Sequence, residues 1–277
     1  MSAPGEPGTV VEAAALMALA ARARAASGAL AERPGVAPTR KRGQGHEIRE
    51  IRPFAEGDDP RHLDAAATAR SGTPQIRSFH EDRERTVLLI ADFRRPMLWG
   101  TRARFRSVAA AEALALIGWQ AVAGAGAAGA VALTDQGILA ERPRPREAGM
   151  ARVAGLLARA HAHALTFAGP SRPLAPDLMR AARFAPRGAG IALATGLDLP
   201  GEGLDAALAA LARRGPLRVL LVEDAFETAP PAAALPFLGP DGRVARARFG
   251  GLPEVRAARL AALALPGLAA ERLPTAP

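Results

Sequence analysis

The stretch TVLLIADFRRPM, from Thr86 to Met97, decides the fold. The run from Thr86 to Ala91 has no polar face, as expected of a central strand in a parallel sheet. Asp92 stands where this strand ends, and open α/β sheets bind ligands at the carboxyl ends of their strands. A divalent cation there would need several oxygen ligands, but Arg94, Arg95 and Pro96 offer no side-chain oxygen. We therefore predict that Asp92 forms an ion pair, with Arg94 as the favoured partner, and does not bind a metal.

From this strand onward, apolar runs alternate with helical patterns. Strands are predicted at residues 86–92, 129–134, 138–142, 190–194 and 217–223, and helices at 102–123, 147–163, 176–184 and 204–213. The turn Asp135-Gln136-Gly137 between two apolar runs indicates a hairpin. This alternation predicts an α/β protein with a doubly wound, mostly parallel sheet, spanning residues 86–225.

Three further segments flank this predicted core. Residues 1–39 are expected to hold one helix, from Thr9 to Leu30, with Thr9 and Glu12 forming a capping box. Residues 40–85 are expected to form a small β-containing subdomain, with short strands at 46–54 and 73–79, that packs on the core through charged residues. Residues 226–277 are expected to contain short strands around the turn Pro240-Asp241-Gly242, and then a helix from Pro253 to Leu263.

The segment from 40 to 85 carries ten basic and nine acidic residues. Such a balance favours an ion-pair network over a phosphate-binding patch, which would be one-sided. We predict a structural charged network of Arg52, Asp58, Asp59, Arg61, Asp64 and Arg70. Asp59, just before Pro60, is also a natural helix N-cap. An alternative is a metal-dependent hydrolase that uses Asp58, Asp59 and Asp64.

The composition restricts the function further. The net charge is +9, and the basic residues are arginines except for Lys41. Nucleic-acid binding stays an alternative for that reason, but the arginines are spread along the chain and aromatic residues are only 4%. The chain has no cysteine, which excludes disulfides and thiolate metal sites. His161 and His163 are predicted to lie at the surface near a helix end. We predict no catalytic residues and no cofactor.

Membrane insertion is not expected either. The uncharged window from Ala113 to Thr134 is interrupted by Gly124, Gly126 and Gly129, and a buried helix followed by a buried strand accounts for it. The N-terminus has no basic residue before its apolar part, so we expect no secretory signal. The absence of cysteine suits a reducing compartment, and we expect a cytoplasmic location.

A long signature in this chain resembles the bacterial family called domain of unknown function 58. Its parts are RGQGHE (42–47), RPFAEGDDPRHLD (52–64), ARSGTPQIRSF (69–79), EDRER (81–85) and the strand into Asp92. The resemblance is best from about 40 to 135 and implies a core like a von Willebrand factor type A domain. It also implies a non-enzymatic, cytoplasm-facing protein that works with a MoxR-type AAA+ ATPase in assembling or activating other proteins.

The chain departs from the family at the metal-ion-dependent adhesion site. The family strand usually ends in D-x-S-x-S, whereas Arg94 and Pro96 stand at the two serine positions here. The later S-D of that site falls near Thr195-Gly196, with the nearest aspartate at Asp198. The family's I-D-W tryptophan is Ala65. The resemblance thus implies a degenerate metal site, and we predict an interaction face of Asp92, Arg94, Arg95, Thr134, Thr195 and Asp198.

Overall fold

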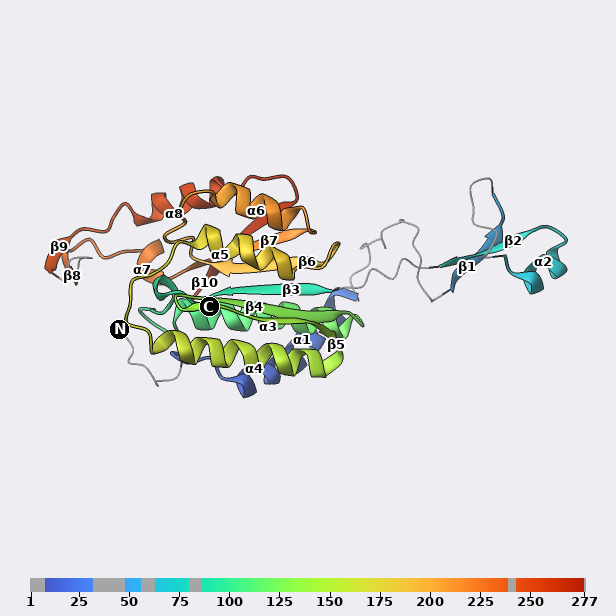
Figure 1. Ribbon diagram of the computed structural model, residues 1–277, viewed down its shortest axis with the longest axis horizontal. Coiled ribbons are helices and arrows are strands. Elements are labelled where there is room, and N and C mark those ends of the chain that lie inside the picture. Colours follow the sequence, from blue (N-terminus) through green and yellow to red (C-terminus); the bar gives the residue numbers. More distant parts are fainter. Residues whose placement is uncertain (1–7, 32–47, 56–62, 80–85, 239–242, 277) are drawn as a thin grey trace.

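A six-stranded sheet in the order β10-β7-β6-β3-β4-β5 forms the centre of the protein (Figure 1). The computed structural model describes residues 8–31, 48–55, 63–79, 86–238 and 243–276. In the middle of the sheet, β3 (Val87–Asp92) pairs in parallel with β4 (Ala127–Thr134) and β6 (Gly190–Thr195). Beyond β6 the sheet continues in parallel with β7 (Leu217–Glu223) and β10 (Leu268–Pro274). The antiparallel β5 (Gly137–Pro145) forms the other edge and joins β4 through the predicted hairpin.

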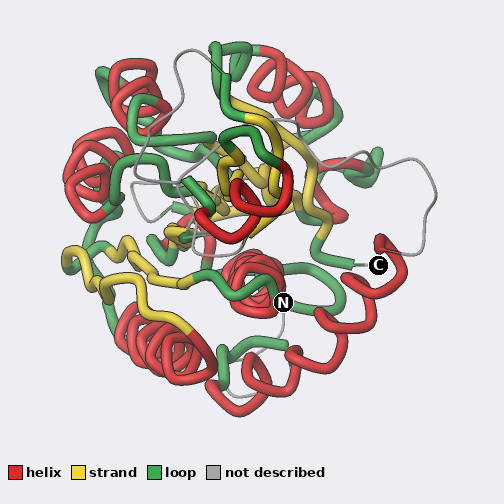
Figure 2. The backbone as a smooth tube through the Cα atoms, turned by 90° about the vertical axis from the view of Figure 1, so that its right-hand side faces the viewer, coloured by secondary structure: helices red, strands yellow, loops and turns green. Residues whose placement is uncertain are grey.

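Helices cover both faces of this sheet, which Figure 2 shows in a view along the strands. One face packs against α1 (Ala13–Ala31), α3 (Arg106–Ala123) and α4 (Arg146–Leu165). The other packs against α5 (Leu174–Ala181), α6 (Leu204–Ala212) and α8 (Leu252–Ala261). Successive side chains of a strand point to opposite faces. Accordingly, Leu89 and Ala91 of β3 belong to the first core, and Leu88 and Ile90 to the second.

This architecture confirms the predicted α/β class and the doubly wound, mostly parallel sheet. It is consistent with a Rossmann-like or von Willebrand A-like fold. The chain leaves β3 for β4 on one side and later returns to β6 on the other, so the strand order reverses at β3 and β6. The carboxyl ends of these two strands are the switch point, where α/β sheets of this kind bind ligands.

Several element boundaries differ from the prediction. Helix α1 begins at Ala13, so Thr9 lies before the helix and the capping box predicted there is wrong. Helix α3 begins at Arg106, after a short 3-10 turn η2 (Arg95–Met97) and a loop. A second 3-10 turn, η3 (Ala182–Phe184), ends the helical stretch that was predicted as one helix. Strand β10 was not predicted, although it forms one edge of the sheet.

The C-terminal part holds a short helix and a separate hairpin. Helix α7 (Ala225–Thr228) follows β7 and has a capping box between Asp224 and Glu227. The antiparallel hairpin of β8 (Leu235–Leu238) and β9 (Val244–Ala247) forms a two-stranded sheet of its own. The turn predicted at 240–242 lies outside the described residues. Strand β10 then ends the described chain.

A third sheet lies between α1 and β3 in the sequence. Strand β1 (Ile48–Pro53) pairs antiparallel with β2 (Gln75–Phe79), and α2 (Ala65–Ser71) lies between them in the chain, where only a helix N-cap at Asp59 was predicted. The predicted β-containing segment is therefore present. Within this segment, β2 contacts β1 and α2. Its expected packing on the core through charged residues stays a prediction. Among the described helices, none is both long and apolar enough to cross a membrane.

Candidate functional site at the carboxyl edge of the sheet

Asp92 and Arg94 form a fully buried, two-pronged ion pair at the end of β3. The Arg94 Nε–H donates to Asp92 Oδ1 at 2.9 Å, and Nη2–H donates to Oδ2 at 2.8 Å. The backbone N–H of Arg94 and the hydroxyl of Thr195 also donate to the two carboxylate oxygens, at 3.1 and 2.8 Å. The carboxylate thus receives four hydrogen bonds, and a cation could reach it only by displacing the guanidinium. The ion pair predicted from the sequence is present.

Arg94 also ties together the loops around the switch point. Its Nη1–H donates to the carbonyl oxygens of Arg172 (2.6 Å) and Leu199 (3.4 Å), and Nη2–H donates to that of Asp198 (3.0 Å). With the two bonds to Asp92, all five guanidinium N–H groups are engaged. Burial disfavours the charged form, but the attraction and hydrogen bonding of Asp92, together with the attraction of Asp135 and Asp198, outweigh it and raise the pKa of Arg94 above its ordinary value. Arg94 therefore stays charged and holds three segments in place.

The loop after β6 has an unusual backbone. Leu197 and Leu199, on either side of Asp198, have φ values of +53° and +47°, in the left-handed region that such side chains rarely adopt. The hydroxyl of Thr195 accepts the N–H of Leu197 at 3.0 Å while it donates to Asp92. A Cβ on Gly196 would overlap Arg106 Nη2 and the Asp198 carboxylate, so only glycine fits there. The surrounding contacts thus hold a strained loop in one conformation.

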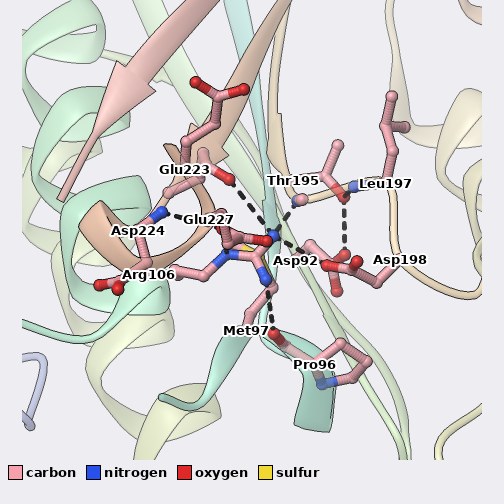
Figure 3. A network of polar contacts seen from close by, with 12 residues as sticks. Asp92, Pro96, Met97, Arg106, Thr195, Leu197, Asp198, Glu223, Asp224 and Glu227 are labelled. Carbon is pink, nitrogen blue, oxygen red and sulfur yellow. Dashed lines mark hydrogen bonds and ion pairs between the residues drawn. The ribbon is translucent and has the colours of Figure 1, made fainter. Parts of the chain in front are cut away.

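A second guanidinium, that of Arg106 on α3, lies beside this loop (Figure 3). Its Nη2–H donates to Asp198 Oδ2 at 2.8 Å and to the Val222 carbonyl at 3.2 Å, and its Nη1–H donates to the Pro96 carbonyl at 3.0 Å. Arg106 has 1% of its surface exposed. It therefore connects the ends of β3, β6 and β7 across the edge of the sheet.

Arg256 on α8 is the third fully buried arginine of this group. Its Nη1–H donates to the Gly196 carbonyl at 2.6 Å, and its Nη2–H donates to the Val222 carbonyl at 2.6 Å and to Glu227 at 3.1 Å. Burial raises the pKa of Glu227 above its usual value, because Arg106 and Arg256 offset only part of the desolvation. For Asp198 the same arginines, together with Arg259, outweigh the burial and lower the pKa. The cluster therefore alternates cations and anions across the whole switch point.

Asp224, the N-cap residue of α7, links this cluster to the loop before α3 and to the residue that follows β10. One carboxylate oxygen accepts the hydroxyl of Thr101 and the N–H of Phe226. The other accepts the N–H of Thr101 at 3.1 Å and the hydroxyl of Thr275 at 3.0 Å. Burial alone would raise the pKa of Asp224, but these hydrogen bonds favour the charged form and lower it. Asp224 is thus a structural anchor for the loop before α3 and the end of β10.

Of the predicted interaction face, Asp92, Arg94, Thr195 and Asp198 lie together. Asp198 takes part through its carbonyl, whereas its carboxylate points to Arg106 and Arg259. Thr134 does not join them: it is buried, and its hydroxyl donates to the Gly137 carbonyl within the β4–β5 turn. The Arg95 side chain is exposed, and its backbone N–H donates to Asp135 at 2.6 Å.

Asp135 was predicted only as a turn residue, yet it fastens the loop before α5 to the same edge. Its Oδ1 accepts the hydroxyl of Ser171 and the N–H of Arg172, both at 2.8 Å. Since Oδ2 accepts the N–H of Arg95, Asp135 joins this loop to the end of β3.

The predicted charged network falls mostly outside the described residues. Asp58, Asp59 and Arg61 lie there, and of Arg52 only the backbone, within β1, is described. Asp64 is buried and caps α2, accepting the Ala67 N–H at 2.8 Å. It thus has the capping role that was predicted for Asp59. Arg70 lies exposed in the last turn of α2. One carboxylate oxygen of Asp64 is engaged in this cap, and Asp58 and Asp59 lie outside the described residues, so the hydrolase alternative stays untested.

His161 is not at the surface, contrary to the prediction, whereas His163 is exposed. His161 is 0% exposed, its Nδ1 accepts the N–H of Val11 at 3.4 Å, and its Nε2 lies 2.9 Å from the Ser107 hydroxyl. The proton is thus on Nε2, which donates to the serine oxygen. This is the wrong tautomer for a base that would activate Ser107. Burial lowers the pKa of His161 to about 4, so it serves as a neutral core residue between α3 and α4.

The fold and site together define an α/β protein whose switch point is filled by buried arginine–carboxylate pairs. Among the described residues, no three histidine or acidic side chains are grouped so that they could hold a metal ion. The family model described as "Protein of unknown function DUF58" matches residues 50–240, which is more than half of the chain. The chain belongs to this family. No curated protein matches it.

Proposed function

We propose that this protein is a non-enzymatic protein-interaction module and that its docking surface is the carboxyl edge of the central sheet. The observation that carries the proposal is the engagement of all five Arg94 N–H groups by Asp92 and by the carbonyls of two other loops. A surface built in this way exists without a bound ligand, so a partner meets a preformed shape. Preformed surfaces bind with a smaller loss of conformational entropy.

We further propose that this edge is a degenerate metal-ion-dependent adhesion site in a von Willebrand A-like core. In the family pattern D-x-S-x-S, the two serines would supply oxygens to a cation beside the aspartate. Arg94 stands at the first serine position and puts its own positive charge against Asp92 at 2.8 Å. The guanidinium thus supplies the charge that a metal would bring, and docking at this edge is independent of divalent ions.

The strand-end face, as we call the residues above this ion pair that are at least partly exposed, consists of Arg95, Arg172, Leu199 and Arg259. Leu199 is 53% exposed although its carbonyl is fixed by Arg94. The side chains of Arg172 and Arg259 are 36% and 33% exposed. Arginine around an apolar residue is typical of the well-packed centres of protein interfaces. The resemblance to the family indicates a MoxR-type AAA+ ATPase as the partner, and we adopt it as the first candidate.

Binding of a purified MoxR-type AAA+ ATPase to two surface variants tests this proposal. Leu199→Asp and Arg95→Glu change only exposed side chains, and each is expected to weaken binding at least about tenfold in calorimetry, as interface anchors do. Arg159→Glu on α4 is the control, because it makes the same charge change at an exposed position on another surface. Treatment of this protein alone with EDTA, followed by removal of the chelator, is expected to leave the affinity unchanged. Equal binding by all variants, or loss of binding after that treatment, would contradict the proposal.

A further inference from the structure

Two adjoining hollows lie at the amino edge of the sheet, opposite the strand-end face, where β3, β4 and β6 begin. The first, of about 780 Å³, is lined mainly by apolar residues, with Arg142 and Arg183 as its charged ones; the apolar residues include Ala127, Pro143, Pro145, Phe184 and Pro186. We call it the apolar hollow. The second, of about 390 Å³, is lined by Arg183, Arg187, Arg213 and Arg214, with Met179 and two alanines between them. We call it the arginine hollow. Arg183 lines both, so the two hollows are neighbours.

The arginines here differ from those of the strand-end cluster because they have no anionic partner. None of the side chains of the arginine hollow, nor that of Arg142 in the apolar hollow, makes an ion pair or hydrogen bond within the described part of the chain. Arg213 caps the C-terminus of α6, where a cation is favoured by the helix dipole. The helix dipole thus accounts for Arg213 but not for the other four arginines of the two hollows. The remaining positive charge is presented to solvent around a concave surface.

The lining residues also restrict the chemistry of the ligand. Guanidinium groups bind carboxylates and phosphates through paired N–H groups. A single-stranded nucleic acid would in addition stack its bases on aromatic side chains, but Phe184 is the one aromatic residue in the described lining of the two hollows. The apolar hollow instead suits an apolar side chain. Phe184 in its lining is 38% exposed, and Met179 in the arginine hollow is 41% exposed. Apolar and arginine-lined hollows side by side match a polypeptide with an apolar anchor next to acidic residues.

We propose that the amino-edge hollows bind an acidic segment of a partner protein, with an apolar side chain in the apolar hollow and the following carboxylates on Arg183, Arg187, Arg213 and Arg214. This surface is separate from the strand-end face, since the two lie at opposite ends of the strands. The protein would then hold two polypeptides at once, one at each edge of its sheet. Such an arrangement suits a protein that brings a client to a second protein.

The test uses a fluorescein-labelled twelve-residue peptide in which a leucine and a phenylalanine are followed by four glutamates. Binding to the full chain is measured by fluorescence anisotropy at low and at physiological salt. A peptide with glutamines in place of the glutamates tests the carboxylates, and a twelve-nucleotide single-stranded DNA tests phosphates. The hollow variant is Arg183→Glu/Arg187→Glu. The matched control is Arg22→Glu/Arg24→Glu, which changes the net charge equally at two exposed positions of α1.

The hollow variant is expected to bind the acidic peptide at least about tenfold more weakly, since two attractions become repulsions. The α1 variant is expected to stay within about twofold of wild type, and the glutamine peptide to bind no variant measurably. No saturable binding of the acidic peptide up to about 1 mM, or an equal loss in both variants, would overturn the proposal. So would DNA binding that is tighter and depends on the same two arginines. None of these outcomes affects Leu199 and Arg95, so the strand-end proposal is judged separately.

Discussion

Replacement of Arg94 by alanine tests whether the switch point depends on the buried guanidinium. Arg94 and the Asp92 side chain are 0% and 1% exposed, so the variant leaves an unpaired buried carboxylate. Breaking a buried pair in this way costs about 3–5 kcal/mol, which is a large part of the total stability of most domains. The carbonyls of Arg172 and Asp198 lose their donor as well. We expect a loss of unfolding free energy in this range.

The assay is urea unfolding followed by the fluorescence of Trp99 and Trp119. Trp99 reports on the site itself, because its indole N–H donates to the Pro96 carbonyl at 2.9 Å. A double-mutant cycle with Asp92→Ala separates the pair from its surroundings and is expected to give a coupling energy of about 2–3 kcal/mol. If Arg94→Ala does not fold, Arg94→Lys replaces it in the cycle, because lysine keeps the positive charge but cannot make the two parallel hydrogen bonds to Asp92.

The exposed pair of Arg218 and Glu271 is the matched control for this cycle. Its two side chains are 50% and 47% exposed, and their N–O distance is 2.6 Å. Exposed pairs contribute at most about 1 kcal/mol. A coupling energy for Asp92 and Arg94 no larger than that of Arg218 and Glu271 would refute the reasoning, because burial would then have no effect.

Two further predictions concern the core and the loop after β6. Because the pKa of His161 is lowered to about 4, the unfolded chain takes up a proton below about pH 6.5 while the native state does not. The stability is therefore complete above that pH and falls by about 2 kcal/mol at about pH 5. Urea unfolding at both pH values should show this component in wild type and His163→Gln but not in His161→Gln; a component that persists in His161→Gln would contradict this assignment. Gly196→Ala is expected to cost about 1–3 kcal/mol, because its Cβ would overlap Arg106. Gly250→Ala, with no atom within 4 Å of the new Cβ, should change little in thermal unfolding, and an equal effect of both would contradict the packing argument.

The central part of the fold could be predicted because its strands carry their own signal. Every residue of β3 is buried, so the run from Val87 to Ala91 had to be apolar throughout. The β4–β5 hairpin was likewise marked by the turn at Asp135–Gly137. Strand β10 lacks such a signal: most of its side chains are exposed, and the sequence LAAERLP has no apolar run. Its place in the sheet comes from pairing with β7 along its whole length, which a local pattern does not show.

The site was predictable only where its residues are neighbours in sequence. Asp92 and Arg94 are two positions apart, so their pairing followed from local chemistry. Arg106 and Arg256 contact residues 10 to 116 positions away, and the sequence analysis missed both. A signal existed for Arg256, which stands four residues after Leu252 and four before Leu260, on the face of α8 that carries its apolar residues. A cation at a position where the helical pattern calls for a leucine indicates a buried partner.

Stability alone does not explain why charged residues fill this part of the core. A buried ion pair contributes little beyond an apolar pair of the same volume, because desolvation offsets most of its attraction. An apolar pair in place of Asp92 and Arg94, however, would leave the carbonyls of Arg172, Asp198 and Leu199 without the donor they now have. Those carbonyls belong to the two loops that carry Arg172 and Leu199 of the strand-end face. The guanidinium is therefore needed for the position of these loops, and a variant that replaces both residues should keep the fold while the loops lose their fixed conformation.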